Sequence, residues 1–535
     1  MIAMSLLDAL LLDPAPFNVW IAVRADGLKG SGTASDPYDG STAARLDGIL
    51  NSLPANSHVR LGPGEFLTQG YAQGISGGWQ VKAGMKFEGS GIGVTTLKLV
   101  NHTANARYFA IGFDLLTTGK LNYCEVSDLT IDCNLVGAGA STSASAVRLM
   151  GDHVKVFRVK AINWGSKDAA KSISVISCVC ATSNSGIPET NNANAGLEDC
   201  IVVLPGAGNV GRCTALSVAN ADEDDFASPE THGKAPFIRH CFVDCAVVTP
   251  DANPTTAKYR GLAMSWCHGG VIVGNQIHNV DIGGPYIDGQ RSTRDVIVRD
   301  NYYRNVARGP FWNLGTLAAG VGTGTLNRSG TVGAVTGLSS FQSFEPGARV
   351  RLITATEFSG VYIIQAKTAT SFTIILPNSG ATSVSVTSAQ KVFGVNRVIV
   401  EGNNIELAAI SGVRGIAVVD NNDSSPYLEP PDYVHEQVIL RNNKIRYLDN
   451  VAPTDGAGTL IELKGVRNII VQNNVLDTIA TVPMAHVRCA NTTYFNNRTP
   501  GGVLLRGLNN TTGAKSSELE TDAEDAFMMA MFNER

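Results

Sequence analysis

The chain has 535 residues, is rich in glycine (56) and carries a formal net charge of -5 with only 17% charged residues. This composition lacks the basic field that nucleic-acid binding requires, and no run approaches the roughly 20 apolar residues of a membrane span. Ten cysteines are too few for a disulfide scaffold of this length, so we expect reduced, buried cysteines.

The amino-terminal part begins with an apolar segment and continues with one predicted helix. Residues 1–17 contain Asp8 and Asp13 but no Lys or Arg, which does not fit a secretory signal peptide, so we interpret them as a docking segment. Residues 42–53 have the apolar period of a helix. The stretches 59–66 and 95–99 alternate as strands do, and Gly-rich turns separate them.

A short repeat dominates the rest of the chain. Two or three aliphatic residues, a two-residue spacer and an asparagine recur, with the asparagines at Asn275, Asn301, Asn403, Asn443 and Asn474. One copy cannot bury its own apolar face, so the copies must stack, as in a solenoid. Asn suits the bend because it tolerates left-handed backbone angles and its amide can bond to the Asn of the next copy.

The same frame extends upstream with cysteine in place of asparagine. Cys178, Cys213 and Cys241 follow aliphatic stretches at similar spacing. We therefore predict that these three cysteines continue the asparagine column.

Together these features resemble the pectate-lyase-like, right-handed parallel β-helix superfamily, which includes tailspike-like proteins, polysaccharide lyases and glycoside hydrolases. The resemblance rests on the predicted helix, on the Leu61-Gly62-Pro63-Gly64-Glu65-Phe66 strand and on the Gly-rich turn before the 95–99 strand, and it covers residues 36–310 and 395–500. It implies an all-β, right-handed parallel β-helix solenoid with an amino-terminal capping helix.

Two further segments break the repeat. Residues 315–394 contain short alternating strands among Gly, Ser and Thr, which predicts a small inserted antiparallel β-module. The last segment has helical period with acids in its first turns, which predicts a short amphipathic helix. The predicted parts are a docking segment (1–17), amino-terminal rungs (18–314), the module (315–394), carboxy-terminal rungs (395–510) and the terminal helix (511–535).

The densest functional candidates lie in residues 281–295. A rung of 26 residues aligns Arg260, Tyr286 and Trp312 along one exterior face, with Asp288 beside them. Aromatic side chains interleaved with charges suit a polysaccharide, because sugars offer apolar ring faces and many hydroxyls. An ordinary polar solenoid surface is the alternative interpretation.

Two chemistries fit such a face. A lyase needs a cation or basic group to neutralise a uronate and a base to take its proton, for which Arg291, Arg294 or Lys234 are candidates. A hydrolase needs two carboxylates, such as Asp288 with Asp281, or with Asp225 or Asp224 of the acidic 222–225 stretch. Of that acidic stretch, Asp224 and Asp225 are candidate ligands for Ca²⁺, and nearby His232 is a candidate substrate contact beside Lys234.

The function expected from these residues and the resemblance is binding, and cleavage by a lyase or hydrolase, of a polysaccharide. The alternative is a non-catalytic, tailspike-like or surface-fibre protein that binds glycans and self-assembles. Either function implies an extracellular or virion-associated protein that forms a homo-oligomer, such as a trimer, through its terminal helices.

Overall fold

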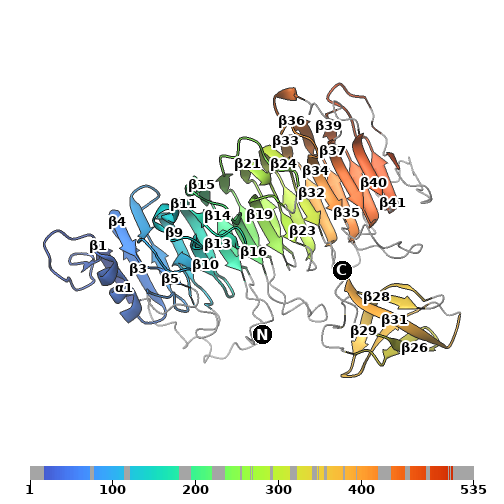
Figure 1. Cartoon of the computed structure of the whole chain (residues 1–535), viewed down its shortest axis with the longest axis horizontal. Helices are drawn as coiled ribbons and strands as arrows, with labels where there is room; N and C mark the ends of the chain where they lie inside the picture. The colour runs from blue at the N-terminus through green and yellow to red at the C-terminus, as the bar shows by residue number, and fades with distance from the viewer. Residues whose placement is uncertain are drawn as a thin grey trace, which may run out of the picture. The chain divides into compact units, whose positions relative to one another are not determined.

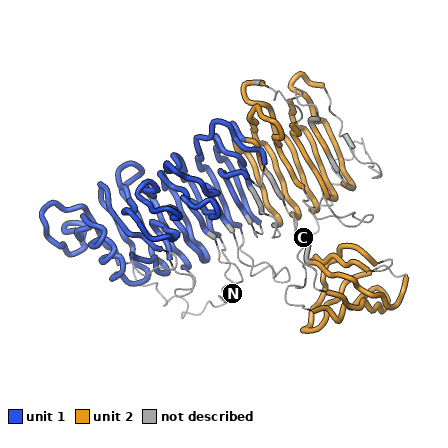
Figure 2. Tube along the Cα trace, in the orientation of Figure 1, with its two compact units in different colours: residues 1–286, 304–306 blue, residues 287–303, 307–535 orange. Residues whose placement is uncertain are grey.

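The computed structural model describes most of the chain between residues 17 and 509. Its undescribed segments are 1–16, 73–77, 114–120, 180–193, 220–234, 254–255, 289–292, 314–321, 340–345, 347–348, 355–357, 377–379, 393–394, 420–434, 452–457, 478–481 and 510–535, with single positions 266, 268, 488, 504, 506 and 507. The predicted docking segment, apart from Phe17, and the predicted carboxy-terminal helix lie outside the described residues. The chain divides into two compact units, 1–286 with 304–306 and 287–303 with 307–535 (Figure 2).

Hydrogen bonds join 36 strands of the described chain in one large, mostly parallel sheet (Figure 1). Each coil contributes up to three strands, and each strand pairs with its counterpart in the next coil. We call the resulting stacks the first, second and third ladders.

In unit 1, the first ladder contains β1 (Phe17–Ala22), β3 (Ser57–Leu61), β6 (Lys86–Glu88), the starts of β9 (Glu125–Asp132) and β11 (Lys155–Ile162), β14 (Gly196–Glu198), β17 (Phe237–Arg239) and β20 (Val271–Val273). The second ladder contains β4 (Gly64–Thr68), β7 (Thr95–Leu99), the ends of β9 and β11, β15 (Ile201–Val203), β18 (Phe242–Asp244) and β21 (Gln276–Ile282). The third contains β5 (Tyr71–Ala72), β8 (Arg107–Ile111), β10 (Ser143–Leu149), β13 (Ser172–Val179), β16 (Arg212–Ala219) and β19 (Tyr259–Ser265).

In unit 2, the first ladder contains β23 (Thr293–Arg299), β32 (Val395–Glu401), β35 (His435–Arg441), β38 (Val466–Gln472) and β41 (Ala490–Phe495). The second contains β33 (Asn404–Leu407), β36 (Lys444–Tyr447) and β39 (Val475–Leu476). The third contains β25 (Phe311–Asn313), β34 (Arg414–Val419), β37 (Thr459–Lys464), β40 (Val482–Val487) and β42 (Leu508–Asn509).

Strand β22 (Tyr286–Asp288) pairs with β25, and strand β24 (Tyr302–Arg308) pairs with β33, so both extend these ladders. The remaining elements are β2 (Tyr38–Asp39), β12 (Gly165–Ser166), helix α1 (Ala43–Ser52) and the short 3₁₀ helices Leu135–Gly137 and Leu448–Asn450. The predicted helix is confirmed, and the Thr42 side chain caps it by accepting a hydrogen bond from the Arg45 backbone nitrogen at 3.3 Å. Of the helices in the described chain, none is long and apolar enough to cross a membrane.

The asparagine ladder is confirmed in unit 2. The side-chain oxygens of Asn403, Asn443, Asn474 and Asn497 each accept from the backbone nitrogen and the amide of the preceding asparagine in the ladder, at 2.8–3.1 Å. The members are Asn301, Asn403, Asn443, Asn474 and Asn497, all at most 1% exposed. Because burial without partners would cost free energy, this chain of amides gives every ladder asparagine a defined partner.

The two roles predicted for asparagine are divided between consecutive residues. The residue before each ladder asparagine has the left-handed conformation, with φ between 50° and 65°, at Gly274, Asp300, Gly402, Asn442, Asn473 and Asn496. The ladder asparagines themselves do not have positive φ. One residue therefore makes the bend and the next joins the coils.

The predicted cysteine column is correct for Cys241 and wrong for Cys178 and Cys213. In unit 1, the Cys241 backbone nitrogen donates to Asn275 at 2.9 Å, and the Cys200 nitrogen donates to the Cys241 sulfur at 3.4 Å. Cys178 instead pairs with Val218, and Cys213 with Tyr259, in the third ladder. The nine described cysteines are free and buried, as predicted.

The inserted module is a closed antiparallel barrel of six strands. These are β26 (Gly324–Ser329), β27 (Val332–Thr336), β28 (Arg349–Thr354), β29 (Gly360–Lys367), β30 (Ser371–Ile375) and β31 (Ser383–Val392). Alternation is evident in β30, where Phe372 and Ile374 are fully buried and Ile375 is exposed. Closure leaves the barrel without an open sheet edge.

Candidate functional site

Asp281, a predicted catalytic acid, is a structural residue. Its side chain is 3% exposed, and its carboxylate accepts hydrogen bonds from the backbone nitrogens of Asp251 (2.7 Å), Lys258 (2.7 Å) and Tyr259 (2.8 Å). Burial raises the pKa of Asp281, although these hydrogen bonds oppose the shift. The carboxylate holds the connection before β19 and offers no open acid group to a substrate.

The predicted exterior row through Arg260 is also wrong. Arg260 is only 7% exposed, and it pairs with Ile282, so this coil advances by 22 residues instead of 26. Tyr286 therefore does not lie beside Arg260. For Tyr286, Asp288 and Trp312 the structure defines the strand backbone, in β22 and β25, and the side-chain roles stay predictions.

Arg294, a predicted candidate base, lies in the first ladder. It belongs to β23 and makes a 3.6 Å ion pair with Asp295, which also pairs with Arg397. Burial, together with Arg397, lowers the pKa of Arg294. A first-ladder ion-pair network therefore occupies this arginine.

The other predicted site residues lie outside the described chain: Arg291, His232, Lys234, Asp224 and Asp225. The Ca²⁺ site predicted at the two aspartates is thus untested. Within the described ranges, no group of three or more His, Cys, Asp or Glu side chains could hold a metal ion.

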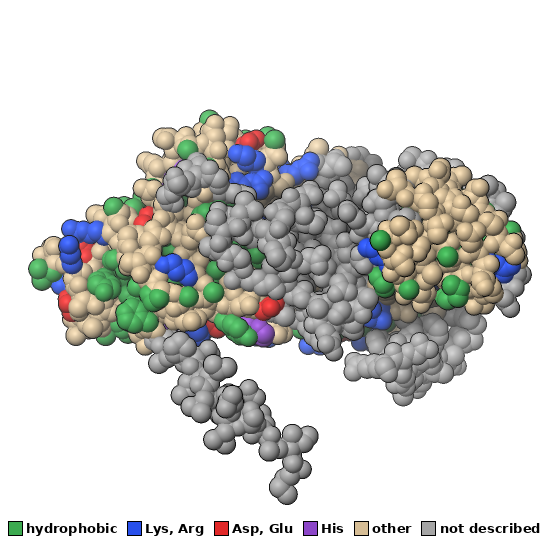
Figure 3. Space-filling view, turned by 90° about the horizontal axis from the view of Figure 1, so that it is seen from below, with side chains coloured by type: hydrophobic (Ala, Val, Ile, Leu, Met, Phe, Trp, Pro, Cys, Tyr) green, Lys and Arg blue, Asp and Glu red, His purple; other side chains and the backbone are tan. Residues whose placement is uncertain are grey.

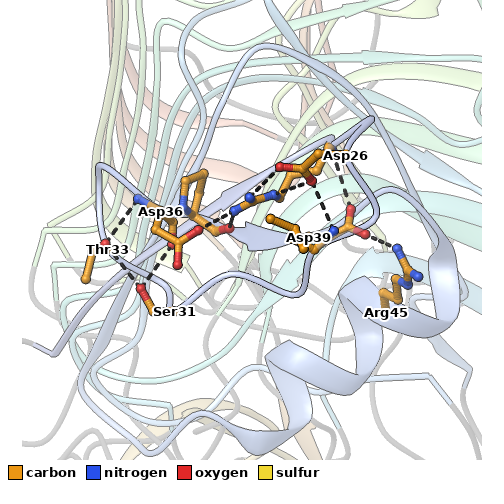
Figure 4. Close-up of polar contacts among 9 residues, drawn as sticks. Asp26, Ser31, Thr33, Asp36, Asp39 and Arg45 are labelled. Atoms are coloured by element: carbon orange, nitrogen blue, oxygen red, sulfur yellow. Dashed lines mark hydrogen bonds and ion pairs between the residues drawn. The ribbon is translucent and has the colours of Figure 1, made fainter.

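Another acidic cluster, near the amino terminus, is neutralised by ion pairs with arginines (Figure 4). Arg24 donates to Asp26 at 2.6–2.9 Å and to Asp36 at 2.6 Å, while Arg45 pairs with Asp39. The hydrogen bonds from Arg24 lower the pKa of Asp26 to about 2. These contacts fasten the loop between β1 and α1 and leave little free carboxylate for a ligand.

A more suitable surface is the outward side of the first ladder in unit 1. Alternation buries Val156, Leu197 and Ile238, each at most 1% exposed, so the residues on either side of each point outward. We call this surface the aromatic face. Its members are Lys155, Phe157, Gly196, Glu198, Phe237 and Arg239, with Tyr123 and His153 at its edge.

Phe237 rests directly on Gly196 of the preceding coil. A Cβ atom at Gly196 would lie 2.2–2.3 Å from three atoms of the Phe237 ring, which means that the ring lies flat over the glycine. The Arg239 guanidinium carbon is 4.4 Å from the ring centroid, and Arg239 also donates to Glu198 at 2.9 Å. Phe237 therefore lies between Gly196 and a guanidinium that Glu198 fixes over the ring.

A second arginine–aromatic pair lies two coils earlier on the same face. The Arg158 guanidinium carbon is 4.6 Å from the Phe157 centroid, and its nitrogens bond to both oxygens of Asp128 at 2.6 and 2.8 Å. Phe157 pairs with Glu198, which pairs with Arg239, so both phenylalanines belong to neighbouring columns of one surface.

At the edge of the face, Tyr123 stacks on His153 of the next coil. The ring centroids are 5.0 Å apart with an interplanar angle of 16°, and Tyr123 is 62% exposed. His153 Nε2 lies 3.1 Å from the amide nitrogen of Asn194. An exposed ring with polar groups at its border can contact both the apolar face and the hydroxyls of a sugar.

Sequence reasoning overlooked this face, although a signal was present. The stretches Lys155-Val156-Phe157 and Phe237-Ile238-Arg239 each place an aliphatic residue between outward-facing positions, so alternation predicts exposed phenylalanines. The flat position of Phe237 could not be foreseen, because it depends on Gly196 lying next to it 41 positions away in the sequence.

Comparison with known proteins identified similar structures only. No family model and no curated protein matches the chain. Similar solved structures include a tailspike mutant of E. coli bacteriophage HK620 in complex with a pentasaccharide (10% identity, 84% of this chain and 62% of that one, TM-score 0.46). Others are the Azotobacter vinelandii mannuronan C-5 epimerase AlgE6 A-module (11%, 89% and 92%, 0.32) and the pre-mature bacteriophage phi29 gene product 12 (12%, 89% and 50%, 0.46).

The chain thus spans less than two thirds of that tailspike chain and half of the phi29 protein. Its own strand pairing settles the architecture, because successive coils pair in parallel within each of the two units. This chain is a parallel β-helix protein with an inserted antiparallel barrel.

Proposed function

We propose that the protein binds a polysaccharide through the aromatic face of unit 1. The observation that carries the proposal is the repetition of arginine-flanked phenylalanine rings along the coil stack. Neighbouring strands lie about 4.8 Å apart, so Phe157 and Phe237, two coils apart, are separated along the stack by about 10 Å. An extended sugar chain lying along the stack can contact both rings.

The polar groups of the face complete the requirements of such a ligand. Glu198 and Arg239 hold each other at 2.8 Å, while His153 and Asn194 border the exposed Tyr123 ring. Sugar hydroxyls can exchange hydrogen bonds with these groups, whereas the aromatic rings contact the C–H faces of the sugar. The protein would act on the outside of a cell or on a virion, where envelope polysaccharides are accessible.

Cleavage of the bound polysaccharide is a separate proposal. Asp281 is engaged by three backbone amides, which leaves Asp288 and Arg291 as the candidate acid and base among the predicted groups of that stretch. New reducing ends or unsaturated products that disappear in Asp288→Asn would support cleavage. Unchanged activity in this variant would exclude Asp288.

Binding is tested with an array of bacterial envelope polysaccharides. We expect wild type to bind at least one glycan and the Phe157→Ala/Phe237→Ala variant to bind it about tenfold or more weakly, since each ring contact contributes about 0.5–1.5 kcal/mol. Phe17→Ala is the matched control, because Phe17 is 55% exposed and lies outside the face. Absence of any bound glycan, or equal binding by the double variant, would refute the proposal.

A second candidate function, that of a structural subunit which self-assembles, is favoured by the barrel. Its surface carries hydrophobic side chains (Figure 3). Val332 pairs with Ile375, and Ile363 precedes the residue that pairs with Ile374, so three exposed aliphatic side chains cross adjacent strands. Light scattering of wild type and of Val332→Thr/Ile363→Thr would show whether this row joins copies of the chain.

A further inference from the structure

We infer that Cys200 and Cys241 form a modification site, at which oxidation joins the two thiols in a disulfide bond between neighbouring coils of unit 1. The pair consists of buried nucleophiles that are not part of the aromatic face, so the inference does not depend on glycan binding. The reduced pair described above is the starting state. The disulfide is the product when the chain folds in an oxidising environment.

The two cysteines occupy the position, directly before a second-ladder strand, that Asn275 has in a later coil of unit 1. The Asn275 side chain accepts a hydrogen bond from the Cys241 backbone nitrogen at 2.9 Å, and the Cys241 sulfur accepts one from the Cys200 backbone nitrogen at 3.4 Å. Ile201 pairs with Phe242, so the cysteines that precede these residues are in register between consecutive coils. Two thiols thus stand one above the other where the asparagines stop.

The spacing of this pair suits a disulfide. Neighbouring strands lie about 4.8 Å apart, and the Cα atoms of disulfide-bonded cysteines are about 4.4–6.8 Å apart. Both side chains lie in the core, at most 1% exposed. Burial raises the pKa of Cys241, and a hydrogen bond with the Cys200 thiol adds to this effect, which places the two sulfur groups in contact.

Cys213 and Cys245 are an alternative pair, but the register does not bring them together. Burial raises the pKa of Cys245, and the nearby Cys213 thiol adds to the shift. Cys213 pairs with Tyr259 in the third ladder, whereas Cys245 follows the second-ladder strand β18. Of these two pairs, only Cys200 and Cys241 are stacked in register.

Burial decides when the bond can form. The thiolate is the reactive species, and the folded chain both covers the thiols and disfavours their ionisation, so oxidation precedes the closing of these two coils. One cysteine thiolate attacks glutathione disulfide and releases a glutathione thiolate, and the other then attacks the mixed disulfide and releases the second glutathione. The two cysteine sulfurs lose two electrons, glutathione disulfide gains them, and the two thiol protons pass to the released glutathione.

The bond would provide a covalent link where the amide links between coils are absent. It joins residues 41 positions apart, and a disulfide that closes a loop restricts the unfolded chain more strongly as the loop lengthens. Closure of the core over the bond would then keep thiol reductants away from it. We therefore expect the oxidised chain to resist unfolding more than the reduced chain does.

The experiment refolds the full chain from urea with glutathione disulfide or with a phosphine reductant. Digestion with trypsin and with a protease that cleaves before aspartate places the four cysteines in separate peptides, because cleavage sites at Asp199, Arg212, Arg239 and Asp244 divide them. We expect mass spectrometry of the oxidised chain to show the Cys200 peptide linked to the Cys241 peptide. The urea midpoint of this chain should exceed that of the reduced chain.

Two serine variants provide the matched comparison. Cys241→Ser should abolish both the linked peptide and the gain in midpoint, whereas Cys245→Ser, at a buried cysteine of the same coil, should keep both. In native oxidised wild type, the bond should survive a thiol reductant that breaks it once urea unfolds the chain. This last measurement needs no variant, so it stands even where a serine variant does not refold.

The outcomes are distinct. Oxidised wild type without a Cys200–Cys241 linked peptide, or with Cys213 linked to Cys245 in its place, would refute the site. A linked peptide with an unchanged urea midpoint would refute the stabilising role of the bond. Rapid reduction of the bond in the native protein would contradict its position in the core.

Discussion

Replacing Asn443 with glycine should destabilise unit 2 far more than replacing its neighbour Asn442 with glycine. The Asn443 side chain accepts from the backbone nitrogen and the amide of Asn403, at 3.1 and 2.9 Å. It donates to the Val400 carbonyl at 2.8 Å and to the Asn474 amide oxygen at 3.0 Å. The change removes all four hydrogen bonds from a site that is 1% exposed.

The expected cost follows from these contacts. Four hydrogen bonds at about 1 kcal/mol each, with about 0.5–1 kcal/mol for the flexibility of glycine, give an upper value of about 5 kcal/mol. The Asn403 amide keeps its bonds to Val298 and Glu401, so part of the loss is recovered. We expect the free energy of unfolding to fall by about 3–4 kcal/mol.

Asn442 should behave oppositely despite the identical substitution. It is exposed and has φ 57°, a left-handed conformation that glycine adopts without strain. Relief of this strain offsets the added flexibility, so the free energy of unfolding should change by no more than about 0.5 kcal/mol.

The assay is equilibrium urea unfolding of the two variants, with the midpoint and slope compared with those of wild type. Unequal midpoints with an unchanged slope would support the division of roles between the bend residue and the ladder residue. Equal shifts, or a loss below about 1 kcal/mol for Asn443→Gly, would refute it.

Three other predictions concern titration and reactivity. Burial lowers the pKa of His435 to about 3, so on acidification the unfolded chain takes up this proton before the folded one. The free energy of unfolding should therefore fall as pH decreases from about 6.5 towards 3, by at most about 1.4 kcal/mol per pH unit. His435→Gln should flatten this dependence in urea unfolding measured at several pH values. Hydrogen bonds from Arg24 lower the pKa of Asp26 to about 2, so the ionised Asp26 side chain should stabilise the fold above pH 3.8 and lose this effect towards pH 2. Asp26→Asn should therefore lower the melting temperature at pH 6 but not at pH 2. The nine buried cysteines should not react with a thiol reagent until urea unfolds the chain, and rapid labelling of several thiols in the native protein would contradict the burial.

The sequence could predict the coil stack because the ladder asparagines recur after aliphatic strands. It could not assign every residue to the correct strand, because each coil has up to three strands with similar patterns. Cys178 and Cys213 fit the frame by spacing but lie in the third ladder, whereas Cys200 belongs to the column. Asn497 was missed because its strand, β41, contains Asn, Thr and Tyr in place of aliphatic residues.

The site was harder to predict than the fold for a related reason. Coil length varies, so the 26-residue step that aligned Arg260 with Tyr286 does not hold where Arg260 pairs with Ile282. Inward-facing positions must be apolar to fill the core, so they repeat in the sequence. Outward-facing side chains follow no repeat, and their neighbours depend on the register between coils. Gly196, for example, supports the Phe237 ring only because the register places the two residues next to each other.

Oxidative footprinting with and without the glycan identified on the array tests the central claim most directly. If the aromatic face binds the glycan, oxidation of Tyr123, Phe157 and Phe237 should slow when the glycan is present, while that of Phe17 should stay unchanged. Protection of Phe17 alone, or unchanged oxidation of the three face residues at saturating glycan, would contradict the account.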